Sequence, residues 1–129
     1  MKALRIDEIE PVDLHGVRWR PVRRTLGIRA FGANVTEADA GEIVVHEHDE
    51  TESGAGQQRH EELYVVLTGV ASFTVAGEVV LAPAGTLVFV PEPAARRGAV
   101  ARADGTRVLA IGGPVGEPYA PPPWEDWFT

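Results

Sequence analysis

The fold of this chain is decided by one stretch, HEELYVVLTG, at residues 60–69. Between Leu63 and Leu67 every residue is apolar, β-branched or aromatic. A run this short with such residues favours a buried strand over a helix. Because side chains alternate along a strand, His60, Glu62 and Tyr64 share one face. The pattern therefore predicts a strand that carries an imidazole, a carboxylate and a phenol in a row.

Short strands separated by turns are expected along most of the chain. The 14 Gly and 10 Pro residues favour many short strands over long helices. About nine strands at close spacing favour a closed barrel or jelly roll over an open sheet. The expected strands cover residues 17–24, 26–35, 42–48, 63–67, 71–75, 79–81, 86–90, 99–102 and 106–111.

Two segments resemble the sequence motifs of the cupin superfamily. Glu62, six residues and Gly69 are similar to the second half of the first motif, which reads Gly, five residues, His-x-His, three or four residues, Glu, six residues, Gly. Residues 85–96 resemble the second motif, which reads Gly, five residues, Pro-x-Gly, two residues, His, three residues, Asn. The resemblance covers roughly residues 41–113. It implies an all-β fold, the cupin-like double-stranded β-helix or jelly-roll barrel.

Length and composition are those of one globular domain. A chain of 129 residues, 44% hydrophobic and 24% charged, can bury a core without disulfides or metals. We expect a single cupin-like domain over residues 1–129, with the barrel core at about 17–112. The tail 113–129 is rich in Pro and aromatic residues, and we expect it to pack on the barrel or on a second subunit. We interpret residues 1–15 as an edge strand or arm, and we expect a homodimer.

Charge and residue usage exclude several classes of partner. There is no Cys, so a metal site would need nitrogen and oxygen ligands. The net charge is −7 and basic residues cluster only at 18–24, which argues against nucleic acid. No apolar window is long enough to span a membrane, and the N-terminus lacks the apolar core of a signal peptide. The sequence therefore predicts no membrane partner and a cytoplasmic location.

The cupin resemblance directs attention to histidines and one carboxylate. In metal cupins it assigns two histidines and the glutamate of the first motif, and a third histidine from the second motif. Residues 55–58, where the spacing calls for histidines, contain none, and Arg96 stands where the third would be. The nearest substitutes are His48, at the end of the preceding strand, and His60. With Glu62 they are the candidate ligands of a divalent metal ion.

An arginine at the site would oppose a metal. Two unit charges ~4 Å apart interact by roughly 4 kcal/mol at an effective dielectric near 20, so an arginine facing a divalent cation would cost about twice that. An inward Arg96 and a bound metal are therefore close to mutually exclusive. Arg96 instead suits a carboxylate, either Glu62 or an anionic ligand. Alternation also allows Arg97, rather than Arg96, to be the inward residue.

More ordinary roles for these residues stay open. His48 lies in an acidic stretch, where histidines are commonly solvated. His60 and Glu62 can form a structural hydrogen-bonded pair, and Tyr64 can be a core residue with its hydroxyl satisfied. The acidic and Gly-rich segment 49–59 is predicted to be a mobile loop beside the site.

These patterns favour a barrel that binds a small molecule in a pocket lined by His48, His60, Glu62, Tyr64 and Arg96. Whether it is an enzyme is left open. One alternative is a metal-dependent cupin enzyme of dioxygenase or isomerase type, with its ion on the three candidate ligands. Another is a structural or interaction module with a filled barrel. A cavity that reaches Glu62 would argue against the last of these.

Overall fold

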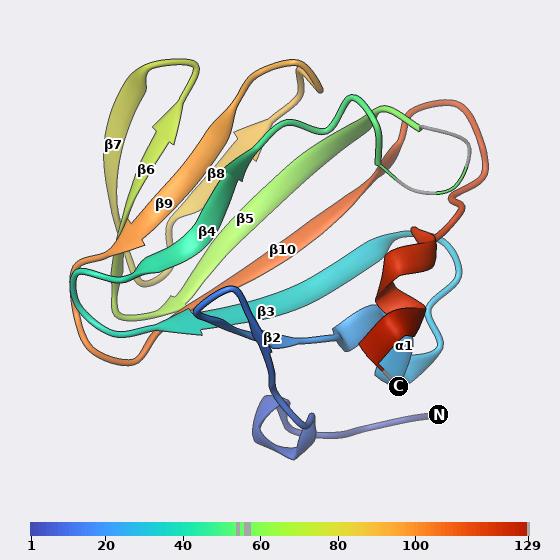
Figure 1. Ribbon diagram of the computed structural model, residues 1–129, viewed down its shortest axis with the longest axis horizontal. Helices are drawn as coiled ribbons and strands as arrows, with labels where there is room; N and C mark the ends of the chain where they lie inside the picture. The colour runs from blue at the N-terminus through green and yellow to red at the C-terminus, as the bar shows by residue number, and fades with distance from the viewer. Residues whose placement is uncertain (54, 56–57, 129) are drawn as a thin grey trace.

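Two antiparallel sheets face each other in the computed structural model, which describes residues 1–53, 55 and 58–128 (Figure 1). Six strands form one sheet in the order β1-β2-β3-β10-β5-β8, and four form the other in the order β4-β9-β6-β7. This arrangement confirms the predicted all-β jelly roll. The strands of the described residues are β1 (Val12–Leu14), β2 (Val17–Arg20), β3 (Gly32–Ala38), β4 (Ile43–His48), β5 (His60–Thr68), β6 (Val70–Val75), β7 (Glu78–Pro83), β8 (Leu87–Val90), β9 (Arg97–Ala101) and β10 (Thr106–Pro114).

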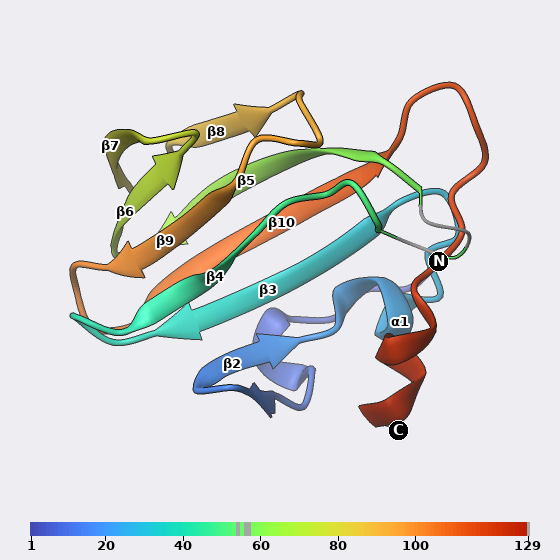
Figure 2. The same cartoon turned by 45° about the horizontal axis from the view of Figure 1, so that its top comes forward.

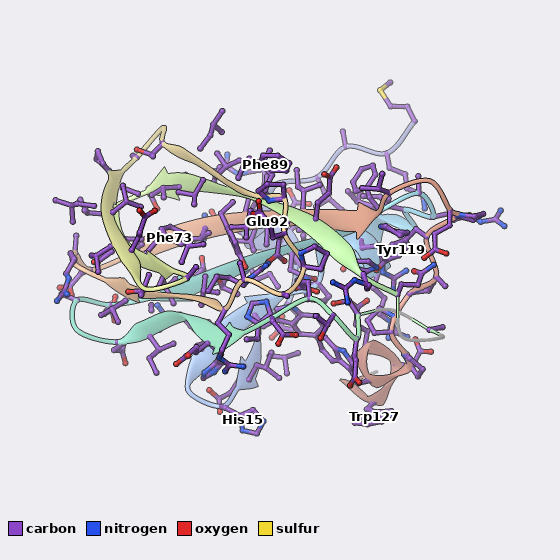
Figure 3. The ribbon with its side chains drawn as sticks, turned by 90° about the horizontal axis from the view of Figure 1, so that it is seen from above. His15, Phe73, Phe89, Glu92, Tyr119 and Trp127 are labelled. Atoms are coloured by element: carbon purple, nitrogen blue, oxygen red, sulfur yellow. The ribbon has the colours of Figure 1, made fainter. Side chains whose placement is uncertain are left out.

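The central strand β5 is the predicted one, and its alternation builds the core. It pairs with β10 on one side and β8 on the other. Tyr64 and Val66 point between the sheets, where they pack in one buried cluster with Phe73 of β6 (Figure 3). Gly69 follows β5 with φ of +74°, and a Cβ there would lie 2.7 Å from the Cα of Thr106. Only glycine fits this turn, which explains why the run ends there.

Short helical segments close one end of the molecule. These are α1 (Val22–Leu26) and the 3-10 helices η1 (Ile6–Glu8) and η2 (Pro123–Phe128). Figures 1 and 2 both show α1 and η2 side by side. None of the described helices is both long and apolar enough to span a lipid bilayer.

The C-terminal tail packs on its own barrel. The Trp124 ring lies 5.4 Å, centroid to centroid, from that of Trp19 on β2. Arg23 of α1 donates to Glu125 from Nη2 at 2.7 Å, and both side chains are buried. Trp127, which we expected to pack, is 77% exposed and points away from the barrel (Figure 3).

Two predicted strand boundaries were wrong near the N-terminus. The strand expected at 17–24 ends at Arg20, because α1 begins after Pro21; β2 is also an inner strand, since β1 pairs with it. The strand expected at 26–35 instead covers 32–38, so it begins later than predicted and includes polar residues beyond the expected end. These polar residues did not look like part of a strand, but Glu37 can be buried because Arg20 and Arg107 form ion pairs with it. The mobile loop predicted at 49–59 includes residues 54, 56 and 57, which lie outside the described residues.

Candidate ligand-binding site

A cavity of about 390 Å³ lies between the sheets, at the end that the tail covers. Its walls come from β2, β3, β4, β5 and β10, from the loop after β4 and from the C-terminal tail. Of the five predicted pocket residues, four line it: His48, His60, Glu62 and Tyr64. Its volume is within the range of small-molecule sites in proteins.

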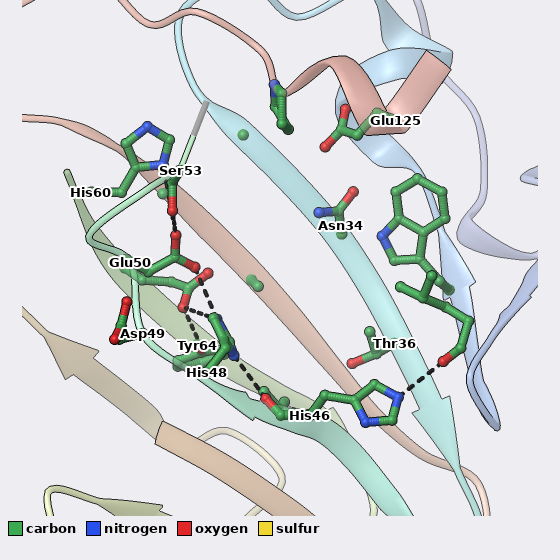
Figure 4. Close-up of a pocket in the computed structure, with 18 of the residues that line it drawn as sticks. Asn34, Thr36, His46, His48, Asp49, Glu50, Ser53, His60, Tyr64 and Glu125 are labelled. Carbon is green, nitrogen blue, oxygen red and sulfur yellow. Dashed lines mark hydrogen bonds and ion pairs between the residues drawn. The ribbon is translucent and has the colours of Figure 1, made fainter. Parts of the chain in front are cut away.

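The polar end of the cavity is formed by His48, Glu50 and Glu62. Figure 4 shows His48 and Glu50 close together there. His48 Nε2 lies 2.9 Å from Glu50 Oε1 and 3.6 Å from Glu62 Oε1. The other ring nitrogen, Nδ1, donates to the backbone oxygen of His46 at 2.7 Å. Both ring nitrogens thus face acceptors, which favours the doubly protonated, positively charged imidazolium.

Arg97 anchors Glu62 from behind the cavity wall. Its side chain is fully buried, and Nη1 donates to Glu62 Oε1 at 3.0 Å. Nε and Nη2 donate to the backbone oxygens of Ala95 and Glu92. Arg97 pairs directly with His48 across the antiparallel strands β9 and β4, so both side chains point to the same face. The register therefore places a guanidinium and an imidazolium on either side of one carboxylate.

The expectation that Arg96 lines the pocket is corrected by this register. Arg96 is the neighbour of an inward residue, so alternation turns it outward. Its side chain is 58% exposed, and Nε donates to Glu47 Oε1 at 3.0 Å. The spacing of the second cupin motif thus identifies the correct turn, but it selects Arg96 where the inward residue is its neighbour Arg97.

Glu50 is a site residue that sequence reasoning missed. It is almost completely buried, and its Oε2 accepts a hydrogen bond from the Ser53 hydroxyl. The acidic stretch around it suggested solvated side chains. Its position two residues after His48, which alternation would place on the same face, is the signal that could have identified it.

Burial and hydrogen bonds determine the protonation states of the cluster. Burial of the His48 ring opposes protonation, but hydrogen bonds to Glu50 and Glu62 outweigh it and raise its pKa to about 10. Burial alone would raise the pKa of Glu62; the donors His48, Tyr64 and Arg97 hold it below its ordinary value. Burial raises the pKa of Tyr64, so this residue stays a phenol that donates to Glu62 Oε1.

His60 lies apart from the ligand atoms of this cluster. It is buried, its ring centroid is 5.5 Å from that of Tyr119, and Nδ1 is 4.0 Å from Glu50 Oε2. Burial lowers the pKa of His60 and favours the neutral ring. Among the described residues, the atoms within 4.8 Å of one another belong to His48, Glu50 and Glu62. That group could hold a metal ion, with Glu50 in the place where we predicted His60.

The opposite wall of the cavity is largely apolar and aromatic. Trp19 of β2 and Tyr119 and Trp124 of the tail line it, together with Val17 and Leu14. His46 also lines the cavity, with Nε2 3.0 Å from the backbone oxygen of Leu14. The site thus joins a charged end to an aromatic wall.

Solved structures match the chain, whereas no protein-family model and no curated protein matches it. KdgF from Halomonas sp. matches with a TM-score of 0.67 at 20% identity, over 82% of this chain and 86% of that one. A predicted oxalate decarboxylase from Thermotoga maritima matches with a TM-score of 0.68 at 17% identity, over 86% and 97%. An RmlC-like cupin from Shewanella frigidimarina matches with a TM-score of 0.62 at 21% identity, over 86% and 88%. The chain therefore has the cupin fold, as the motif resemblance predicted.

The fit of a metal to this site is mixed. One imidazole and two carboxylates have the number and spacing of metal ligands. A buried guanidinium only 3.0 Å from Glu62 Oε1 opposes a second cation at the same oxygen. The ligand set also differs from the three histidines and one glutamate of the cupin motifs.

Proposed function

We propose that this protein binds a small organic molecule in the cavity between its sheets. The proposal rests on one observation: the cavity reaches the buried carboxylate of Glu62. A filled barrel, as in a purely structural module, would place apolar side chains there instead. The polar end can orient a ligand through directed hydrogen bonds, while the aromatic wall can bury its apolar part.

A screen of a small-molecule library by thermal shift tests the proposal. A ligand that binds only the folded state raises the melting temperature in proportion to its occupancy. Replacing Ala110, a wall residue, with Phe should fill the cavity and abolish the shift. The matched control is Ala94→Phe at an exposed position, which should preserve it. Ligands that stabilise the wild type and Ala110→Phe equally would contradict the proposal.

A metal centre at His48, Glu50 and Glu62 is the second candidate, because three ligand atoms lie within 4.8 Å of one another. We expect weak or no metal binding in the wild type, since Arg97 already neutralises Glu62. The variant Arg97→His removes the opposing charge and adds a nitrogen ligand opposite His48. It should raise zinc affinity at least tenfold, as measured by titration calorimetry and metal analysis.

The matched control for that variant is Arg96→His, which places the new imidazole outside the cavity and should leave zinc binding unchanged. Stoichiometric metal in wild-type protein purified without added metal would favour the metal-dependent alternative over our proposal. The homodimer and the cytoplasmic location stay predictions of the sequence.

A further inference from the structure

Three oxygen atoms of the cavity wall could accept a hydrogen bond from a bound ligand. The first is Asn34 Oδ1, which is buried and has no hydrogen-bond partner among the described residues. Gly32, Asn34 and Thr36 alternate along β3 and all line the cavity. Figure 4 shows Asn34 between Glu125 and the cluster at His48. A buried acceptor without a donor costs free energy, which a bound ligand with an N–H or O–H group would recover.

Two carboxylates of the wall also keep one oxygen unused. Within the described part of the chain, every hydrogen bond and ion pair to the Glu62 side chain ends on Oε1, which leaves Oε2. Glu125 is 3% exposed, and its Oε2 accepts both hydrogen bonds from Arg23; among the described residues no donor to its Oε1 is seen. Both unused oxygens belong to groups that carry negative charge.

The donors at the polar end of the cavity, and those of Arg97 behind it, already make hydrogen bonds. His48 donates from both nitrogens, Tyr64 donates to Glu62, and Ser53 donates to Glu50. Arg97 donates from three nitrogens and stands behind the wall. The hydrogen-bonding atoms left at this end are therefore acceptors, which suit a ligand that donates hydrogen bonds rather than an anionic one.

The sum of charges on the wall also disfavours an anion. Five carboxylates line the cavity; Arg97 pairs with Glu62, Arg23 with Glu125 and His48 with Glu50, and Arg96 lies 4.0 Å from Asp49. Among the described residues this leaves Glu52 without a cationic partner, so the net charge of the wall is negative. The lining carboxylates are Asp49, Glu50, Glu52, Glu62 and Glu125. Aromatic rings stand opposite, and the faces of Trp and Tyr rings attract cations.

We propose that the ligand is an organic amine, protonated at neutral pH, whose ammonium group donates to Asn34 Oδ1 and to a wall carboxylate. Its apolar part packs against Trp19 and Trp124. This inference rests on the proposed function and names the ligand class of the same cavity. It differs from the anionic ligand that an inward Arg96 would have suited.

Three probes of matched shape but different charge test the ligand class: benzylamine, benzyl alcohol and benzoate. Binding is followed by NMR through the indole N–H signals of the three tryptophans. Trp19 and Trp124 line the cavity, whereas Trp127 is exposed and serves as an internal control. We expect benzylamine to shift the first two signals with a Kd at least tenfold below that of benzyl alcohol, and benzoate to bind most weakly.

Equal or tighter binding of benzyl alcohol or benzoate would overturn the amine inference and leave the proposed function intact. Absence of binding by all three probes would also overturn it, while the library screen decides the proposed function separately. Asn34→Leu should weaken benzylamine at least fivefold, and the isosteric Asn34→Asp should strengthen it. Thr74→Asp adds the same charge at an exposed site on β6 and should change nothing. Weaker benzylamine binding by a folded Asn34→Asp variant would contradict the inference.

Discussion

At the scale of single residues, the pair formed by Arg97 and Glu62 determines the charge balance of the cavity. The guanidinium is inaccessible to solvent, and each of its three nitrogens donates either to a backbone oxygen of the turn before β9 or to Glu62. Removing one partner of a buried ion pair leaves the other charged and uncompensated. The pair therefore matters more for stability than its single short contact suggests.

Replacing Arg97 with Met should destabilise the protein by about 3 to 5 kcal/mol, because Glu62 would stay buried without its counter-charge. Arg96→Met is the matched control and should change the free energy of unfolding by no more than about 0.5 kcal/mol. Urea denaturation measures both. A double variant that also carries Glu62→Gln should recover part of the loss; equal effects of the two single variants would contradict this assignment.

The raised pKa of His48 makes stability depend on alkaline pH. A histidine whose folded-state pKa lies above its unfolded value adds stability that is complete below about pH 6.5, the unfolded pKa. This contribution is lost as the pH rises through the folded value of about 10. We expect the urea midpoint of chelator-treated protein to fall between pH 7 and pH 10, and to fall less in His48→Gln. Parallel curves for the two proteins would show that His48 does not hold its proton.

Site residues on regular strands could be predicted from the sequence, and those that depend on loops could not. Alternation alone places Glu62 and Tyr64 on one face, because strand geometry fixes it. Glu50 lies in a loop whose acidic composition suggested solvent. The choice between Arg96 and Arg97 stayed open because alternation before β9 depends on the length of a turn, which the motif spacing does not determine.

At the scale of elements, the C-terminal tail carries two tryptophans that lie in different surroundings. Trp124 lies against Trp19 and forms a wall of the cavity, whereas Trp127 extends into solvent. Sequence composition predicted packing for both, since aromatic residues dominate buried surfaces. It could not distinguish them, because composition does not determine which residues of the tail reach the barrel.

Trp124→Ala should lower the free energy of unfolding by about 2 to 3 kcal/mol, because it leaves part of Trp19 without a packing partner. It should also increase quenching of tryptophan fluorescence by acrylamide, as Trp19 becomes accessible. The control Trp127→Ala should cost less than about 0.5 kcal/mol and decrease quenching. The reverse order of stabilities would mean that the tail packs elsewhere in solution.

Most elements follow from the sequence, with the region around α1 as the exception. Seven of the nine expected strands lie at their predicted positions, whereas those expected at 17–24 and 26–35 were misplaced on either side of this helix. The helix α1 was missed because five residues are too few to show helical periodicity, and Gly27, with φ of +75°, ends it. Because α1 was not recognised, the following strand β3 was predicted too early in the sequence.

At the scale of the whole molecule, apolar side chains are exposed on the outer strands of both sheets. Leu81 of β7 and Leu87 and Phe89 of β8 are each more than half exposed. Strands at the edge of a sheet are natural sites of association. The predicted homodimer therefore has a more suitable surface here than at the tail, whose Trp124 is already buried.

Light scattering after size-exclusion chromatography should give twice the chain mass of 13.9 kDa for the wild type. Phe89→Glu should shift it to the monomer, since a charge would be buried at the interface. Trp127→Glu, an equally exposed aromatic on the tail, should leave the dimer intact. If Trp127→Glu dissociates the dimer and Phe89→Glu does not, the interface lies at the tail. A monomeric wild type would exclude the dimer.

The two adjacent arginines before Gly98 affect how the charges of the interior respond to a shift in the register of β9. Strand slippage by one position ordinarily exchanges the inner and outer side chains. Here a shift by one residue can bring the guanidinium of Arg96 to the place of that of Arg97. Gly98, which follows them, has no side chain to turn inward. A shift that brings Arg96 into the place of Arg97 would therefore leave Glu62 with a cationic neighbour, whereas a shift in the opposite direction would bring Gly98 there and leave the carboxylate without one. The electrostatic character of the cavity is thereby protected against a register shift in one direction only.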